Sequence, residues 1–262
     1  MKVLPLRIDS SPFVKIVNCF NISMFDMSMA HVQPYLDALG GVNIIVTTNL
    51  SHVASLDRGE MAEPDCYYDA DLVLCDSRVL NDICTLMGKG LTNVIPGSDL
   101  TEYMFDNILS RSDRVMILGS TFQDVQALKR KYDFTCLEYY SPPFGFIESK
   151  DEIDKIILAV KEFNPRYVFL ALGSLRQEAL ACKLKPVLHN RCDLYCIGAS
   201  IDFLVGAQKR APKVFRRLHL EWFYRLLTNP RRLIRRYFLD FLRLFYIFAR
   251  EVPSLITKSS KI

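Results

Sequence analysis

Five short runs of hydrophobic residues, rich in β-branched side chains, recur along the chain and predict β-strands. They are VNIIV at 42–46, DLVLC at 71–75, RVMIL at 114–118, YVFLAL at 167–172 and DLYCI at 193–197. Continuous apolar runs are typical of strands that are covered by helices on both faces of a sheet. The pattern therefore predicts an α/β fold with a Rossmann-like, mostly parallel sheet flanked by helices.

Three of these strands are followed by a turn of small or polar residues and then by a helical pattern. The segments are TTNLSHVASL, GSTFQDVQALKRKY and GSLRQEALACKL. In a parallel sheet such turns lie at the carboxyl edge, where ligands bind and helix N-termini face anions. Functional side chains are therefore expected in these turns.

The pattern changes near residue 207. Aromatic residues and leucines recur at spacings of three and four between arginines, which predicts amphipathic helices with Pro230 at the start of the second. Residues 207–262 carry 14 basic and 3 acidic side chains, a net charge of +11, whereas residues 1–206 carry −7. We predict an α/β domain over 1–206 and a basic helical appendage over 207–262.

Composition excludes several classes of protein. With 262 residues, 50% of them hydrophobic, the chain is neither disordered nor of low complexity. The apolar run in the segment MKVLPLRIDSSPF is too short for a secretory signal peptide. Charged residues interrupt the apolar stretch 237–249, so no membrane span is expected. The eight cysteines form no CxxC pair and the four histidines lack zinc-ligand spacing, which predicts reduced core thiols of a cytosolic protein.

Carboxylates are the first candidates for chemistry. Asp76 follows the strand DLVLC and could act as a general base, or could instead be a helix N-cap. Gln177 and Glu178 follow Gly173 and could contact a sugar or ribose, or could simply open a helix. The DxD at 69–71 precedes its strand, so a metal site there is rejected. No GxGxxG is present, which argues against a dinucleotide-binding enzyme.

The basic appendage suits an anionic partner, although a solvated helical face is the alternative. Nucleic acid, anionic lipid and a nucleotide-bearing substrate are the three candidates. Arginine outnumbers lysine ten to four in 207–262, and the planar guanidinium binds diphosphates through paired hydrogen bonds. No nucleic-acid-reading motif is present, so nucleic acid is not expected as a partner.

Several segments together resemble the WecG/TagA/CpsF family, glycosyltransferase family 26. The main block is IGASIDFLVGAQKRAPKVFRRLHLEWFYRLLTNPRRLIRRY at 197–237, and GSLRQE at 173–178 and VTTN at 46–49 match more briefly. LCDSRVL is similar to the segment around the family's proposed catalytic aspartate, here Asp76. Ser77 and Leu175 stand where the family usually has glycine and proline.

The resemblance implies an inverting, metal-independent transfer of a sugar from a UDP-sugar donor to a polyprenyl diphosphate-linked saccharide, in exopolysaccharide, capsule or teichoic acid biosynthesis. No cofactor is implied, and a homo-oligomer is left open. The enzyme would be cytoplasmic and peripheral on the inner face of the cytoplasmic membrane. A catalytically impaired family member that acts as a membrane-recruited binding protein is the alternative.

The same resemblance implies roles for individual residues. Asp76 and Thr47 would be catalytic, and the appendage would complete the active site and touch the membrane. The predicted substrate-binding residues are Asn49, Gln177, Glu178, Asp202, Arg225, Arg232 and Arg235.

On the appendage an apolar stripe would either enter the membrane interface or pack on the α/β domain. Its predicted members are Phe238, Phe241, Leu242 and Phe245.

Overall fold

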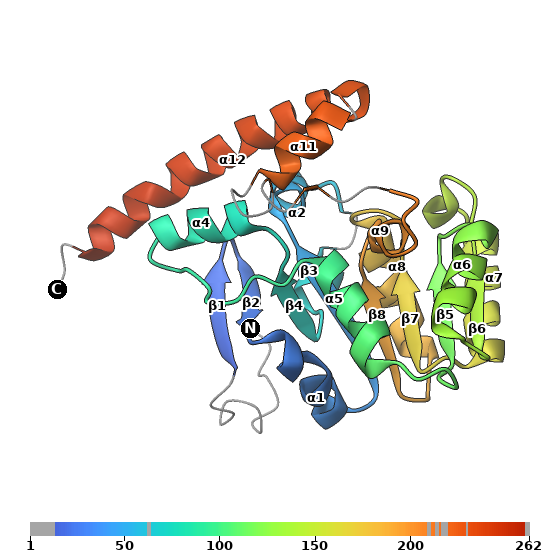
Figure 1. Ribbon diagram of the computed structural model, residues 1–262. Helices are drawn as coiled ribbons and strands as arrows, with labels where there is room; N and C mark the ends of the chain where they lie inside the picture. The colour runs from blue at the N-terminus through green and yellow to red at the C-terminus, as the bar shows by residue number, and fades with distance from the viewer. Residues whose placement is uncertain are drawn as a thin grey trace.

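The computed structural model describes residues 14–61, 64–208, 211–212, 215, 220–228 and 230–259. Its centre is a six-stranded sheet with strand order β4-β3-β8-β7-β5-β6, beside which lies an antiparallel hairpin, β1-β2 (Figure 1). In chain order the elements are β1 Lys15–Cys19, β2 Ile22–Asp26, α1 Met29–Leu39, β3 Val42–Thr48, α2 Leu50–Asp57, α3 Asp65–Tyr68, β4 Leu72–Cys75, α4 Arg78–Leu86, α5 Gly97–Tyr103, η1 Met104–Ile108, β5 Val115–Leu118, α6 Phe122–Tyr132, β6 Leu137–Tyr140, η2 Phe146–Glu148, α7 Lys150–Phe163, β7 Tyr167–Leu170, α8 Arg176–Leu184, η3 Lys185–Val187, β8 Cys192–Cys196, α9 Ser200–Leu204, α11 Glu221–Thr228 and α12 Pro230–Ser259.

The predicted α/β, Rossmann-like architecture is confirmed. All five predicted strands form, as β3, β4, β5, β7 and β8, and every neighbouring pair in the six-stranded sheet is parallel. The three predicted helices after strands are α2, α6 and α8. The sequence pattern missed β6 and the β1-β2 hairpin. β6 has the sequence LEYY and lies at the sheet edge, where its glutamate is exposed, so it lacks a continuous apolar run.

Both faces of the sheet are buried, which explains the continuous apolar strands. On one face Ile44 and Val46 join a core that includes Val53 of α2, together with residues of α4, α7 and α8. On the other face Ile45 packs in a core with Leu36 of α1 and with residues of α5, α6 and α9. Successive residues of a strand therefore pack into the cores on opposite faces of the sheet, because β-strand side chains alternate between the two faces.

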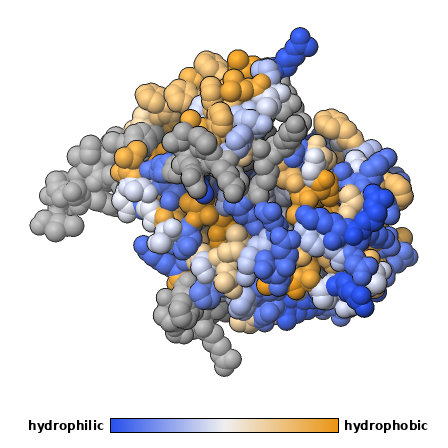
Figure 2. Space-filling model, in the orientation of Figure 1, coloured by the Kyte–Doolittle hydropathy of each residue, from blue (hydrophilic) through white to orange (hydrophobic). Residues whose placement is uncertain are grey.

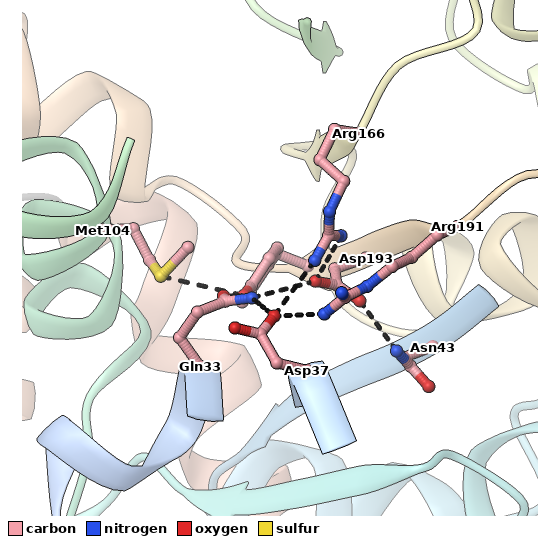
Figure 3. A network of polar contacts seen from close by, with 8 residues as sticks. Gln33, Asp37, Asn43, Met104, Arg166, Arg191 and Asp193 are labelled. Atoms are coloured by element: carbon pink, nitrogen blue, oxygen red, sulfur yellow. Dashed lines mark hydrogen bonds and ion pairs between the residues drawn. The ribbon is translucent and has the colours of Figure 1, made fainter. Parts of the chain in front are cut away.

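A network of ion pairs occupies the amino edge of the sheet, where β3 and β8 begin (Figure 3). The fully buried carboxylate of Asp193 accepts hydrogen bonds from Arg166 Nη1 at 2.6 Å and from Asn43 Nδ2 at 2.8 Å. Gln33 of α1 donates to both Asp37 and Asp193. Burial alone would lower the pKa of Arg166, but the Asp193 carboxylate raises it above its usual value. This edge is thus filled by structural contacts that hold α1 against the sheet.

The C-terminal helices present an apolar face to solvent. Phe238, Phe241, Leu242 and Phe245 of α12 are all exposed, from 48% to 67%, so the stripe does not pack on the α/β domain. Hydrophobic residues gather over α11 and the adjoining part of α12 (Figure 2). Pro230 opens α12, as predicted. Within the described residues, no helix is both long and apolar enough to cross a bilayer.

All eight cysteines are free thiols, as predicted. Five of them are buried in the core, and burial raises the pKa of Cys75 and of Cys192 to about 12. A thiol whose pKa is raised in this way carries little thiolate at neutral pH, so these side chains act as small hydrophobic residues.

Candidate active site

The ends of β3 and β4 bring three of the predicted site residues together. The two strands pair in parallel with Thr48 opposite Cys75, and the backbone N–H of Asp76 donates to the Thr48 carbonyl at 2.8 Å. Thr47 and Asn49 thus leave β3 at the same edge where Asp76 leaves β4. This is the carboxyl edge of the sheet, opposite the ion-pair network.

Asp76 is held by two hydrogen-bond donors from different segments. Its Oδ1 accepts from the backbone N–H of Gly97 at 2.8 Å, and its Oδ2 accepts from Asn49 Nδ2 at 3.4 Å. The N-cap of α4 is Ser77, whose hydroxyl accepts from the Leu80 N–H at 3.2 Å. The N-cap alternative for Asp76 is therefore wrong, and Ser77 serves as the cap instead. A carboxylate held in this way is a group that can serve as a general base.

Gly97 is packed so closely against Thr47 that a side chain would not fit. A Cβ at position 97 would lie 2.8 Å from Thr47 Oγ1, with Ser200 Oγ and the Ile197 carbonyl oxygen each at 3.5 Å. The Thr47 hydroxyl donates to the Cys196 carbonyl at 3.2 Å. Position 97 therefore needs glycine for space, and this contact brings the end of β8 and the start of α9 to Thr47.

The β1-β2 hairpin holds the segment that leads to Gly97. Asp26, the last residue of β2, accepts backbone hydrogen bonds from Thr92 at 2.8 Å and Asn93 at 2.9 Å. Burial raises the pKa of Asp26, but hydrogen bonds from Thr92 and Asn93 outweigh it and lower the pKa overall. An ionised Asp26 thus fixes the loop from which the Gly97 N–H reaches Asp76.

Asn49 has a second role as the N-cap of α2. Its Oδ1 accepts from the backbone N–H groups of Ser51 and His52, and His52 Nδ1 in turn accepts from the Asn49 N–H at 3.2 Å. With Nδ1 as an acceptor, a neutral His52 carries its proton on Nε2. Nε2 lies 3.3 Å from Glu178 Oε1, close enough for electrostatic attraction although the angle falls short of a hydrogen bond.

Gln177 and Glu178 lie in the first turn of α8 and are buried behind this edge, at 3% and 1% exposure. Gln177 Oε1 accepts from the Gly198 N–H at 3.0 Å, and its Nε2 donates to Glu178 Oε1 at 2.9 Å. Together with His52 they connect the starts of α2, α8 and α9. In this structure they contact one another and neighbouring loops.

Tyr67 lies beside this buried group. Its hydroxyl shares a 2.6 Å hydrogen bond with Thr48 Oγ1, and its ring is 5.7 Å from that of His52. Burial, with a further contribution from the Glu178 carboxylate, raises the pKa of Tyr67 well above its ordinary value. Tyr67 therefore stays neutral and extends the polar network beneath Thr47 and Asn49.

The remaining predicted residues come from α9 and from the C-terminal helices α11 and α12. Asp202 is on α9, where burial and the nearby Asp124 carboxylate raise its pKa. Arg235 is exposed on α12. The side chains of Arg225 and Arg232 lie outside the described residues, so their predicted role stays a prediction.

Two further details bear on the sequence analysis. Leu175, which replaces the usual proline, precedes α8 with φ of +67°, a left-handed backbone conformation that proline cannot adopt. Asp71 of the DxD accepts from the Ile44 N–H at 2.8 Å and pairs with Lys185, so it serves the fold. Within the described residues, no three His, Cys, Asp or Glu side chains are grouped to hold a metal ion.

Sequence reasoning missed Gly97 and His52. A signal for Gly97 exists in Pro-Gly-Ser-Asp at 96–99, a helix start, but its closeness to Thr47 depends on the tertiary fold. His52 stands three residues after Asn49, the spacing of a capping box, with histidine in the place usually taken by Glu or Gln.

Fold and site together define the class: an α/β protein with a parallel sheet, a carboxylate at the carboxyl edge of that sheet and a basic C-terminal appendage. Residues 17–257 match a protein-family model described as "Glycosyl transferase WecG/TagA/CpsF family". This match spans most of the chain, which therefore belongs to the WecG/TagA/CpsF glycosyltransferase family.

Two relatives carry the same descriptive name, N-acetylglucosaminyldiphosphoundecaprenol N-acetyl-beta-D-mannosaminyltransferase. The protein from Bacillus spizizenii strain W23 is 34% identical over 168 residues, which cover 62% of this chain and 63% of the relative. The Staphylococcus aureus strain NCTC 8325 protein is 24% identical over 219 residues, covering 82% of this chain and 84% of the relative. The match with the Bacillus protein thus spans less than two thirds of its length.

The tight contact at Gly97 predicts that Gly97→Ala impairs glycosyl transfer more than it impairs folding. Its φ is not left-handed, so alanine adds no backbone strain, but the methyl group would displace the Thr47 hydroxyl. We expect turnover to fall about tenfold, equivalent to about 1.4 kcal/mol. Gly40→Ala is the control, because φ of +67° destabilises the fold there far from Asp76. Equal turnover of the two variants would contradict the role of Gly97.

Proposed function

We propose that this protein transfers a sugar, with inversion of configuration, from a UDP-sugar to a saccharide linked to polyprenyl diphosphate, in the synthesis of a cell-surface polymer. By the names of its relatives, the sugar would be N-acetylmannosamine and the acceptor N-acetylglucosaminyl diphosphoundecaprenol. Family membership supports glycosyl transfer in general. The donor, the acceptor and the mechanism are part of the proposal.

The observation that carries the proposal is the oriented carboxylate of Asp76. Donors on Gly97 and Asn49 hold it at the carboxyl edge, where parallel α/β sheets bind ligands. A carboxylate accepts several hydrogen bonds, and in the proposal one of these comes from the acceptor hydroxyl. Thr47 and Asn49, on either side of the end of β3, would orient the sugar hydroxyls.

The reaction then needs one proton transfer and one displacement. Asp76 takes the proton from the acceptor hydroxyl as the hydroxyl oxygen attacks the anomeric carbon of the donor. The bond between that carbon and the β-phosphate oxygen breaks, and UDP leaves with the bonding electrons from the opposite face. Attack from the face opposite the leaving group accounts for inversion.

The leaving diphosphate acquires negative charge, and its neutralisation is usually a large part of catalysis. In the proposal Arg225, Arg232 and Arg235 of the appendage supply the countercharge through paired hydrogen bonds. The exposure of Arg235 and the packing of α12 on α2, next to Asn49, are consistent with this role. Metal ions are not required in this scheme.

The apolar face of α12 would dock on an anionic lipid surface. Exposed aromatic rings alternate with arginines along this helix, the composition of an interfacial amphipathic helix. At about 1 kcal/mol for each basic residue near an anionic surface, four arginines contribute roughly 4 kcal/mol. Such binding would bring the enzyme to a lipid-linked acceptor at the inner face of the cytoplasmic membrane.

Asp76→Asn tests the general base. Asparagine keeps the shape of the side chain but cannot accept the proton, so turnover should fall by roughly 100-fold or more. The assay measures transfer from UDP-N-acetylmannosamine to undecaprenyl diphosphate-linked N-acetylglucosamine. Asp154→Asn, an exposed site on α7, is the control. Turnover of Asp76→Asn near that of the control would rule out Asp76 as the base, and an inactive wild-type protein would favour the binding-protein alternative.

Replacement of Phe238, Phe241 and Phe245 together by serine tests membrane docking. Loss of about 1 kcal/mol at each partly inserted ring should weaken binding to phosphatidylglycerol vesicles by roughly 100-fold. All three rings are exposed, so the thermal unfolding temperature should change little. Phe144→Ser is the control, because Phe144 is 95% exposed in the loop after β6. Unchanged vesicle binding by the triple variant would contradict docking through this face.

A further inference from the structure

Helix α2 contacts the candidate active site at one end and the C-terminal helix along the rest of its length. Its N-cap, Asn49, donates to Asp76. The side chains of Ser51, Asp57 and Arg58 contact α12, which lies across α2 (Figure 1). Only one residue, Leu50, therefore lies between a contact with α12, at Ser51, and Asn49, the residue that orients the proposed base.

The contact between the two helices is polar and largely buried. Asp240 of α12 is 5% exposed, and it accepts hydrogen bonds from Ser51 Oγ at 2.6 Å and from Arg58 Nη1 at 3.0 Å. Asp57 of α2 pairs with Arg243, and with Arg250 at 3.1 Å. We refer to Ser51, Asp57, Arg58, Asp240, Arg243 and Arg250 as the α2–α12 seam.

The seam is reciprocal, because each helix supplies a carboxylate that meets an arginine of the other helix. A buried charge is costly without its partner, so this arrangement favours a single register of the two helices. A slide by one helical turn, about 5.4 Å, would separate both sets of partners. Apolar packing alone, such as that of Ile247, would tolerate such a slide more readily.

The seam and the exposed aromatic stripe lie on opposite sides of α12. At about 100° per residue, Asp240, Arg243 and Ile247 share one side of the helix, and Phe238, Phe241 and Phe245 share the other. The burial of the first group and the exposure of the second agree with this placement. One face of α12 is therefore committed to α2 while the other stays available to a lipid surface.

We propose that the α2–α12 seam is a positioning device, which holds the start of α2, and through Asn49 the base Asp76, in a set place relative to the lipid surface under α12. This inference rests on the proposed function, because it assumes a lipid-linked acceptor. The acceptor hydroxyl is tethered to the membrane by its polyprenyl diphosphate, so its reach is limited. Asp240 and Arg58 are thus positioning residues that act through α2.

Charge reversal at the seam separates this role from simple stabilisation. Asp240→Arg places two arginines together and should release α12 from α2, while it leaves the aromatic stripe intact. Asp154→Arg on α7 makes the same change of charge at an exposed site and is the control. Both variants should bind phosphatidylglycerol vesicles equally well. Asp240→Arg should unfold at a lower temperature, because it removes a buried ion pair, so kcat is compared well below the unfolding temperature of either variant.

Turnover should distinguish the two variants. With undecaprenyl diphosphate-linked N-acetylglucosamine in vesicles, Asp240→Arg should lose at least tenfold in kcat relative to Asp154→Arg. The double variant Asp240→Arg with Arg58→Asp restores opposite charges across the seam and should recover at least a third of wild-type kcat. A seam that served stability alone would leave kcat unchanged at a temperature where both variants are folded.

Three results would overturn the proposal: equal kcat for Asp240→Arg and Asp154→Arg, no recovery in the double variant, or loss of vesicle binding in step with kcat. If Asp240→Arg fails to fold, Ser51→Ala replaces it, because it removes only the 2.6 Å hydrogen bond to Asp240. About a threefold loss of kcat is expected there, and no loss would overturn the proposal. A wild-type protein that transfers no sugar would overturn the proposed function itself.

Discussion

The backbone hydrogen bond from Asp76 to the Thr48 carbonyl fixes the position of the proposed catalytic carboxylate. It extends the β3–β4 pairing by one step beyond Cys75, so that two chain segments leave the sheet side by side. Asp76 and Asn49 can touch only because of this register. The Gly97 N–H then completes the environment of the carboxylate from a third segment. A change of register would separate all three groups at once.

Polar side chains are concentrated at both edges of the sheet, but they are used differently. At the amino edge Asp193, Arg166 and Asn43 satisfy one another, and the carboxylate is sealed from solvent. At the carboxyl edge Asp76 is only partly buried, while Gln177 and Glu178 form a buried layer behind it. The first edge is thus filled by structural contacts, and the second combines a buried supporting network with a partly exposed carboxylate.

The sequence pattern predicted five of the six strands of the main sheet because helices cover both faces of that sheet, which makes these strands continuously apolar. It could not predict β6, which has an exposed glutamate at the sheet edge, or the β1-β2 hairpin, whose strands mix exposed and buried side chains. The position of Asp76 at the carboxyl edge was predictable because it directly follows a strand of a parallel sheet, whereas Thr47 and Asn49 were singled out by the family resemblance. Gly97 was not predictable, because its role depends on a contact with Thr47, which lies 50 positions earlier in the sequence. His52 was not, because its partner Glu178 comes from a different helix.

Hydrogen–deuterium exchange with bound UDP and a short-chain polyprenyl diphosphate-linked N-acetylglucosamine tests most directly whether the active site lies at this carboxyl edge. Ligand contact and ordering of the surrounding loops should slow exchange of nearby backbone amides. We predict protection in segments 47–52, 76–80, 96–99 and 198–200, with no change at the amino edge around 37–43 and 191–193. Protection at the amino edge without any at the carboxyl edge would contradict the account.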